Sequence, residues 1–317
     1  MDKYDVVVIG GGAAGLSAAL VLGRARRQVA VVDAGEPRNA PAAHRQGFLG
    51  SDGLPPSDLL ATGREEVRGY DVRLISGIVA EVTALAGDEP SGTPAFDVRL
   101  EDQSVLRTRR VLITTGLRDH VPDLPGVAER WGRDLLHCPY CHGYEVRDRP
   151  LGVLGGNEAA PAHAHLIRQW SDDVVYFANG TDLDSDQRES LTARGIGVVE
   201  TPVAGLVVER DQLAGVRLAD GTVVPRAAVF VRPEFMPHDT LLTDLRCSTG
   251  PDGWVTVDAT GRSSVSGVWA AGNAVNPRAQ VITAAGEGSA AAIAINNDLV
   301  EEDVHIALTL YRQGLPD

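Results

Sequence analysis

The sequence predicts an α/β fold in which one domain is inserted into another. Two similar segments support this prediction. An apolar strand at Tyr4–Ile9 runs through glycines into a helix of small residues at Ala13–Gly23, and a second segment of this kind opens at Leu151–Gly156. A strand of the first kind returns at Val268–Gly272. Buried parallel strands that alternate with close-packed helices are typical of Rossmann-like nucleotide-binding domains, so we expect two of them, the second inserted in the first.

The other elements follow from apolar periodicity and from turn formers. Val29–Val32 completes the first βαβ unit. Beyond it we expect a loop at Pro37–Pro56, a helix at Leu59–Tyr70, short strands within Val72–Leu100, a buried strand at Val111–Thr114, a linker at Arg118–Gly126 and a long helix at Val281–Val300. These features place the outer domain at residues 1–117 and 245–317 and the inserted domain at 118–244.

Charge and hydropathy exclude two classes of partner. The 317-residue chain has a formal net charge of −14, and its basic cluster Arg24, Arg26 and Arg27 has no aromatic residue between its members. We interpret that cluster as a solvated helix end and expect no nucleic-acid partner. No apolar run approaches the roughly 20 residues that cross a bilayer, so we expect no membrane association. Since the first strand begins at Tyr4, we expect no signal peptide and a cytoplasmic protein.

The segment Gly10–Gly15 matches the dinucleotide fingerprint G-x-G-x-x-G. It follows a strand and opens a helix, as that fingerprint requires. Gly10 permits the tight turn, Gly12 lets the backbone approach a pyrophosphate, and Gly15 permits close contact between helix and strand. Asp33 ends the next strand, where an acid receives a ribose hydroxyl. The alternative, a merely glycine-rich turn, does not account for the strand, the helix and the acid together.

A pair of cysteines, Cys138 and Cys141, forms the second chemical signal. Thiols at this spacing close a redox-active disulfide when the first lies near a helix N-terminus, although a buried structural pair is also compatible with the spacing. His137 and His142 flank the pair and offer zinc ligands on paper, but there is no second Cys-x-x-Cys, so we expect no metal. Cys247 stands alone and is interpreted as a small core residue.

Several motifs in order resemble the low-molecular-weight thioredoxin reductase family over essentially the whole chain. They are the Gly10–Gly15 fingerprint, Thr114-Thr115-Gly116, Cys138-x-x-Cys141, Gly155-Gly156, Ala270-Ala271-Gly272-Asn273 and Gln280-Val281. The resemblance implies an FAD-dependent enzyme that works as a homodimer. It also implies that Cys141 is the sulfur that exchanges electrons with the flavin. The implied FAD-binding residues are Gly10, Gly12, Ala13, Ala14, Gly15, Asp33, Thr115, Gly116, Gly272, Asn273, Gln280 and Val281.

The chain departs from this family in its second fingerprint, Gly155-Gly156-Asn157-Glu158-Ala159-Ala160. Asn157 stands at the middle glycine position, where a side chain crowds the pyrophosphate. The strand Val174–Phe177 is followed by Asp182 and by no basic cluster that could hold the 2′-phosphate of NADPH. We therefore expect a degenerate NAD(P)H-binding-like domain. Asn273 is a further departure, since the family has Asp there, and by the resemblance it contacts the FAD ribityl chain.

His142 replaces the acid that follows the cysteine pair in thioredoxin reductases. Histidine titrates near neutrality and can accept a thiol proton, although a structural histidine is the alternative. The segment Cys-Pro-Tyr-Cys-His-Gly is similar to that of FAD-dependent dithiol oxidases of the gliotoxin and holomycin type. His137 has no matched role.

These observations favour an FAD-dependent dithiol oxidase that forms a disulfide in a small-molecule dithiol. The resemblance implies O2 as the electron acceptor, and Cys138, Cys141 and His142 are its expected catalytic residues. One alternative is an NADPH-dependent disulfide reductase with a thioredoxin-like protein partner. Another is a flavin-bound redox sensor.

Overall fold

The computed structural model describes residues 3–85 and 95–313. Residues 1 and 2, with which the expected outer domain opens, lie outside that range, as do residues 86–94 and 314–317. The chain divides into two compact units. Unit 1 comprises residues 1–38, 57–118 and 236–317, and unit 2 comprises 39–56 and 119–235.

Unit 1 contains a seven-stranded sheet in the order β3-β2-β1-β6-β5-β4, with β17 also paired to β6. The strands β1, β2, β3, β6 and β17 are parallel, whereas β4 and β5 are antiparallel. Val6–Val8 in β1 are completely buried, as expected of a parallel strand covered on both faces. The strand bounds are β1 Lys3–Ile9, β2 Val29–Asp33, β3 Arg73–Ser76, β4 Val79–Ala84, β5 Phe96–Leu100, β6 Val105–Ile113 and β17 Val268–Ala270.

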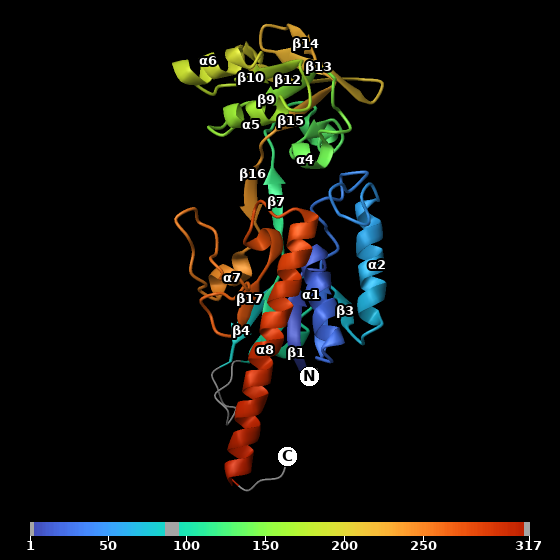
Figure 1. The fold of residues 1–317 in the computed structure, drawn as a ribbon, viewed down its shortest axis with the longest axis vertical. Coiled ribbons are helices and arrows are strands. Elements are labelled where there is room, and N and C mark those ends of the chain that lie inside the picture. The colour runs from blue at the N-terminus through green and yellow to red at the C-terminus, as the bar shows by residue number, and fades with distance from the viewer. Residues whose placement is uncertain (1–2, 86–94, 314–317) are drawn as a thin grey trace. The chain divides into compact units, whose positions relative to one another are not determined.

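The helices of unit 1 include two that lie side by side, α1 and α8 (Figure 1). A Cβ atom at Gly288 of α8 would lie 2.0 Å from the carbonyl oxygen of Ala14 in α1, so only glycine permits this approach. Small residues therefore set the spacing of the two helices. The helix bounds in this unit are α1 Ala13–Arg24, α2 Pro56–Arg68, α7 Thr240–Asp244, a 3-10 turn η1 at Gly272–Ala274 and α8 Val281–Gln313.

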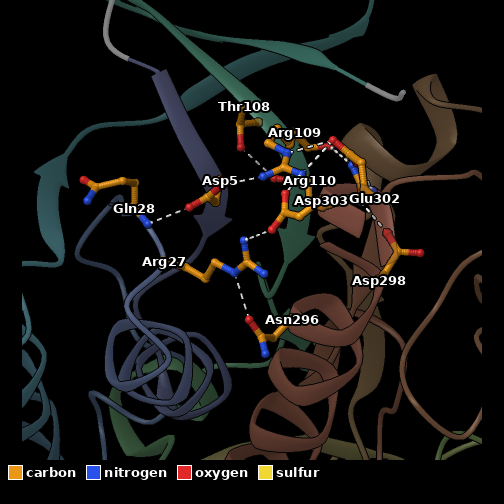
Figure 2. A network of polar contacts seen from close by, with 10 residues as sticks. All are labelled: Asp5, Arg27, Gln28, Thr108, Arg109, Arg110, Asn296, Asp298, Glu302 and Asp303. Atoms are coloured by element: carbon orange, nitrogen blue, oxygen red, sulfur yellow. Dashed lines mark hydrogen bonds and ion pairs between the residues drawn. The ribbon is translucent and has the colours of Figure 1, made fainter. Parts of the chain in front are cut away.

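Helix α8 continues to Gln313, beyond the end expected at Val300. A network of ion pairs holds this longer helix to the sheet (Figure 2). Arg110 of β6 contacts Asp298, at 2.6 Å, and Glu302. Because Glu302 lies past the expected end and is buried with its partner, the additional turns are stabilised by charges that hydrophobic periodicity does not detect.

Unit 2 contains a five-stranded parallel sheet in the order β11-β10-β9-β15-β8 and an antiparallel sheet of β12, β13 and β14. Its helices are α3 Val127–Arg130, α4 Pro139–His142, α5 Ala160–Ile167 and α6 Ser185–Ala193. Its strands are β8 Leu135–Leu136, β9 Leu151–Leu154, β10 Val174–Phe177, β11 Gly197–Val199, β12 Val203–Glu209, β13 Gln212–Leu218, β14 Val223–Pro225 and β15 Ala228–Val231.

The boundaries between the units differ from the expected ones by more than one residue in two places. Unit 1 resumes at Met236 rather than at residue 245, because Leu241 and Leu242 of α7 pack into its core. Residues 39–56 are grouped with unit 2, where Pro41 packs against Gly132. The chain also passes between the units within a two-stranded ribbon of β7 Leu117–His120 and β16 Glu234–Pro237. Among the described helices, none combines the length and the apolar character that a bilayer span requires.

Candidate active site

The outer fingerprint forms a short turn between β1 and α1. Gly10 has a φ of 104°, and a Cβ atom there would lie 2.4 Å from the carbonyl oxygen of Thr114. A Cβ at Gly15 would lie 1.9 Å from the carbonyl oxygen of Gly10. At Gly12, the N-cap of α1, an added Cβ would meet no atom within 4 Å, and no side chain caps the helix. The turn thus presents open backbone N–H groups of a helix N-terminus, which suits a pyrophosphate.

Asp33 lies beside this turn at the end of β2. Its Oδ1 atom accepts a hydrogen bond from the backbone N–H of Gly11 at 3.0 Å. Its Oδ2 atom pairs with Arg64 at 3.0 Å. The carboxylate is therefore held next to the glycines, as the sequence predicts for an acid that receives a ribose.

Two further expected segments converge on the same turn. The hydroxyl of Thr114 donates to the carbonyl of Gly10 at 2.9 Å, which fixes the start of Thr115-Gly116. A Cβ at Gly272 would lie 3.1 Å from that of Ala14 in α1 and 3.5 Å from that of Ala284 in α8. Val281 is the first residue of α8, and Gln280 precedes it with an exposed side chain. Thr114 and Gly272 therefore bring two of the expected segments to the outer turn, and the contacts of all the expected residues with FAD remain predictions.

The carboxamide of Asn273 forms hydrogen bonds within the loop that contains it. Its Nδ2 atom donates to the carbonyl oxygens of Asn276, at 2.9 Å, and Ala279, at 3.0 Å. Its Oδ1 atom accepts from Arg38 at 3.1 Å. An aspartate, which is acceptor-only when ionised, could not make the two donor contacts, and this gives a physical reason for Asn at this position.

In unit 2, Cys138 and Cys141 are joined by a disulfide, with their Cα atoms 5.2 Å apart. Cys138 is the N-cap of the short helix α4, and its carbonyl accepts from the backbone N–H groups of Cys141 and His142, each at 3.1 Å. Pro139 at the first helical position suits the start of the helix because it lacks an N–H. The sequence thus predicted the local position of the pair.

His142 ends α4 and is half-buried. Burial lowers the pKa of its imidazole, and the nearby charge of Glu145 opposes that shift only in part. The ring is therefore neutral at pH 7 and can accept a proton. Trp170 packs against the C-terminal end of α4, since a Cβ at the C-cap residue Gly143 would lie 2.9 Å from its indole ring.

His137, the other flanking histidine, packs into an aromatic group. Its ring centroid lies 5.2 Å from that of Phe235 and 6.2 Å from that of His163. His163 is buried, and desolvation followed by the charge of Arg232 lowers its pKa to about 4. The sequence does not reveal this role of His163, because a histidine inside a helix gives no signal of burial.

The inner fingerprint forms a longer turn, residues 155–159, between β9 and α5. Asn157 spans it: its Oδ1 atom accepts from the N–H of Ala159, and its Nδ2 atom donates to the carbonyl of Arg232, each at 3.1 Å. The N–H of Gly156 donates to the hydroxyl of Thr181 at 2.7 Å. Protein groups thus occupy N–H donors that a working dinucleotide site presents to phosphate.

A cavity of about 560 Å³ adjoins this inner turn and is lined by residues 155–159 and 231–234 together with His120 and Pro122. Its charged lining residues are two acids, Glu158 and Glu234, and one cation, Arg232. Asp182 is exposed two residues before the N-cap of α6. This balance of charge is unfavourable for a phosphate-rich ligand.

Cys247 is buried in the core of unit 1, where its thiol donates to the Ser263 hydroxyl at 3.5 Å. Burial raises the pKa of the thiol, so it remains protonated and unreactive. The interpretation of Cys247 as a core residue is confirmed.

Comparison with known proteins identifies the family. The family model of pyridine nucleotide-disulphide oxidoreductases matches residues 4–288. The chain belongs to this family. It is 30% identical to thioredoxin reductase sirT of Leptosphaeria maculans, over 95% of this chain and 96% of that protein. Among solved structures it is similar to HlmI, with 56% identity, a TM-score of 0.95, and 98% and 97% of the two chains covered. An oxidoreductase from Agrobacterium tumefaciens shares 33% identity, with a TM-score of 0.86 and coverage of 94% and 99%.

Membership confirms the α/β fold and the resemblance to thioredoxin reductases, and it makes the protein a disulfide oxidoreductase that binds FAD. The open turn at Gly12 and the carboxylate of Asp33 fit the diphosphate and ribose of that cofactor.

Proposed function

We propose that the protein is an FAD-dependent dithiol oxidase that closes a disulfide in a small molecule and passes the electrons to O2. The observation that carries this proposal is the inner turn, in which Asn157 and Thr181 engage the backbone N–H groups that NADPH would need. An enzyme with no usable NADPH site must draw electrons from its thiol substrate. The similarity to HlmI supports the same conclusion.

The first steps need only the cysteine pair. A substrate thiolate attacks the sulfur of Cys138, the bond between the two cysteines breaks, and Cys141 leaves as a thiolate. A second substrate thiol then attacks the mixed disulfide and releases the oxidised product and the Cys138 thiol. In balance, one dithiol and one O2 give one disulfide and one hydrogen peroxide. Bound FAD supplies the two-electron link between the reduced pair and O2.

His142 handles the protons of these steps. Each substrate thiol must lose a proton before its sulfur can attack, and a neutral imidazole next to the pair can accept it. Burial keeps His142 in that neutral form, since it lowers the pKa of the ring. An acid at this position would be ionised and a weak base at pH 7, so histidine favours oxidation of a thiol.

Two cysteine variants test the assignment of roles. Cys138→Ser frees Cys141 as a thiolate, which we expect to give a broad long-wavelength absorption band with oxidised flavin that fades in acid. Cys141→Ser should lack this band and should trap a mixed disulfide through Cys138 when offered a disulfide, which mass spectrometry would detect. Both variants should retain FAD and lose turnover. A band in Cys141→Ser alone would reverse the two roles, and turnover in both variants would exclude the pair as the redox centre.

The second candidate is a disulfide reductase that acts on a thioredoxin-like protein, and it is favoured by the similarity to thioredoxin reductase sirT. The two candidates differ in electron source, because a reductase needs NADPH whereas an oxidase consumes O2 in proportion to dithiol. Measurement of oxygen uptake with a small dithiol, with and without NADPH, separates them. We further propose a cytoplasmic homodimer for either function.

A further inference from the structure

Among the residues that the structure describes, three arginine side chains are almost completely buried: Arg110 and Arg130 are 3% exposed and Arg45 is 4% exposed. The first two are neutralised. Each forms ion pairs with two carboxylates, Arg110 with Asp298 and Glu302 (Figure 2), and Arg130 with Asp134 and Asp211. Both follow the usual rule that a buried charge has a partner of opposite sign.

Arg45 does not follow this rule. In the range of residues 3–85 and 95–313, it forms no ion pair with a carboxylate. One guanidinium nitrogen donates to the hydroxyl of Ser51 at 2.9 Å, and the guanidinium carbon lies 5.0 Å from the ring centroid of Phe48. The Nε atom is buried and has no hydrogen-bond partner. A neutral hydroxyl and an aromatic ring therefore face the positive charge, and one of its N–H groups is left without a partner.

The loop around Arg45 holds the side chain in place. The backbone N–H of Arg45 donates to the carbonyl of Leu54 at 2.8 Å, and its carbonyl accepts from Gly53 at 2.9 Å. The N–H of Gly47 donates to Asp52 at 2.7 Å, which closes the same loop. These contacts fix the backbone on both sides of the arginine. The protein has thus stabilised a loop that keeps an unpaired cation buried.

We propose that Arg45 is a binding site for an oxyanion carried by a ligand of this protein. A guanidinium group offers parallel N–H donors that match the two oxygens of a carboxylate or a phosphate, and it stays charged at every relevant pH. The unused Nε–H, beside a terminal nitrogen of the same planar group, provides such a donor pair. The oxyanion supplies the counter-charge that Asp298 and Glu302 supply to Arg110.

Two ligands can carry this group, and they leave different signatures. A substrate with a carboxylate or phosphate substituent would leave the site free in the FAD-loaded enzyme, so that inorganic phosphate could enter it. An oxygen of FAD itself would occupy the site permanently in that enzyme. Phosphate would then have no effect, whereas loss of the arginine would weaken FAD binding.

The experiment compares the FAD-loaded wild-type enzyme with its Arg45→Met variant in two measurements. The first is the melting temperature of each protein in sodium phosphate and in sodium chloride of equal ionic strength. The second is the dissociation constant of FAD for each protein. Arg147→Met is the matched control, because it removes the same charge from an exposed position in the same unit. For a substrate-borne oxyanion, phosphate should raise the melting temperature of the wild type by about 2–4 °C more than that of Arg45→Met, with equal FAD affinity. For an FAD oxygen, Arg45→Met should bind FAD about 10- to 100-fold more weakly.

Either result supports an oxyanion at Arg45. A variant that matches the wild type in both its phosphate response and its FAD affinity overturns the proposal. Arg45→Lys provides the second test if Arg45→Met does not fold. A lysine keeps the charge but cannot form two parallel hydrogen bonds, so the phosphate response or the FAD affinity should fall several-fold. An Arg45→Lys enzyme identical to the wild type in both measurements would also overturn the proposal.

Discussion

The two glycine turns of the protein begin alike and end differently. In both, the first glycine follows a buried parallel strand, and its N–H donates to the next strand, Gly10 to Val32 at 2.8 Å and Gly155 to Phe177 at 2.7 Å. After this point the outer turn needs only residues 10–12 to reach its helix, whereas the inner turn uses residues 155–159. In the outer turn, no side chain caps the N-terminus of the helix that follows. In the inner turn, the side chain of Asn157 accepts a hydrogen bond from a backbone N–H at the corresponding helix N-terminus.

This difference teaches that a glycine turn can lose nucleotide binding in two ways. A side chain can block the space of the ligand, or it can form hydrogen bonds with the backbone N–H groups that would otherwise bind phosphate. The sequence indicated that Asn157 would crowd a pyrophosphate. In the structure, the carboxamide takes a further role, because it accepts the N–H that a phosphate oxygen would have accepted. The inner domain keeps its sheet and its core, and it carries the cysteine pair on α4. We infer that it was retained as the scaffold of that pair.

The largest expected effect comes from copying the inner residue into the outer turn. A Cβ at Gly12 meets no protein atom within 4 Å, so Gly12→Asn should fold normally. Its side chain would nevertheless occupy the space of the pyrophosphate, and FAD affinity should fall roughly 10³-fold. Flavin fluorescence titration measures the affinity, and circular dichroism checks the fold. Normal FAD content in Gly12→Asn would show that the outer turn is not the diphosphate site.

An intermediate effect is expected at His142, the last residue of helix α4 in unit 2. His142→Gln keeps the size and polarity of the side chain but removes the base, so flavin reduction by a dithiol should slow roughly 10²-fold with FAD content unchanged. In the wild type, protonation of His142 removes the base. Since burial lowers its pKa, the rate should decline only as the pH falls below 6.5, the ordinary value. Stopped-flow measurement from pH 5 to 8 tests both statements, and an unchanged profile in His142→Gln would assign the decline to another group.

The smallest effect is expected from the reverse exchange, Asn157→Gly. The variant loses two hydrogen bonds near the surface, so its free energy of unfolding should fall by about 1 kcal/mol. It should not gain rapid reduction by NADPH, because the inner turn remains longer and Thr181 still binds the N–H of Gly156. Thermal unfolding and anaerobic mixing with NADPH test these expectations. Rapid reduction of Asn157→Gly would mean that this one side chain blocks an otherwise intact site.

Much of this arrangement could be predicted because its signals are local. The strand at Tyr4–Ile9, the outer glycine turn, the pairing of Cys138 with Cys141 and the burial of Cys247 all follow from short patterns in the sequence. The end of α8 could not be predicted, because its last turns depend on ion pairs with residues almost 200 positions earlier.

The same limitation applied to two other features. Asn273 was expected to face FAD, and nothing in its sequence neighbourhood indicates that it binds the carbonyls of Asn276 and Ala279. The burial of Arg45 has no signal in the sequence, because an arginine in a polar loop is normally exposed. Only the folded loop shows that its charge is buried and lacks a carboxylate.

The most direct test of the central claim uses the FAD-loaded wild-type enzyme without oxygen. Excess NADPH should leave the oxidised flavin spectrum unchanged for minutes, because Asn157 and Thr181 close the inner turn. A small dithiol should bleach the same spectrum, and admission of O2 should restore it with one hydrogen peroxide formed for each dithiol oxidised. Rapid bleaching by NADPH at micromolar concentration, with no bleaching by the dithiol, would contradict the account and establish a reductase.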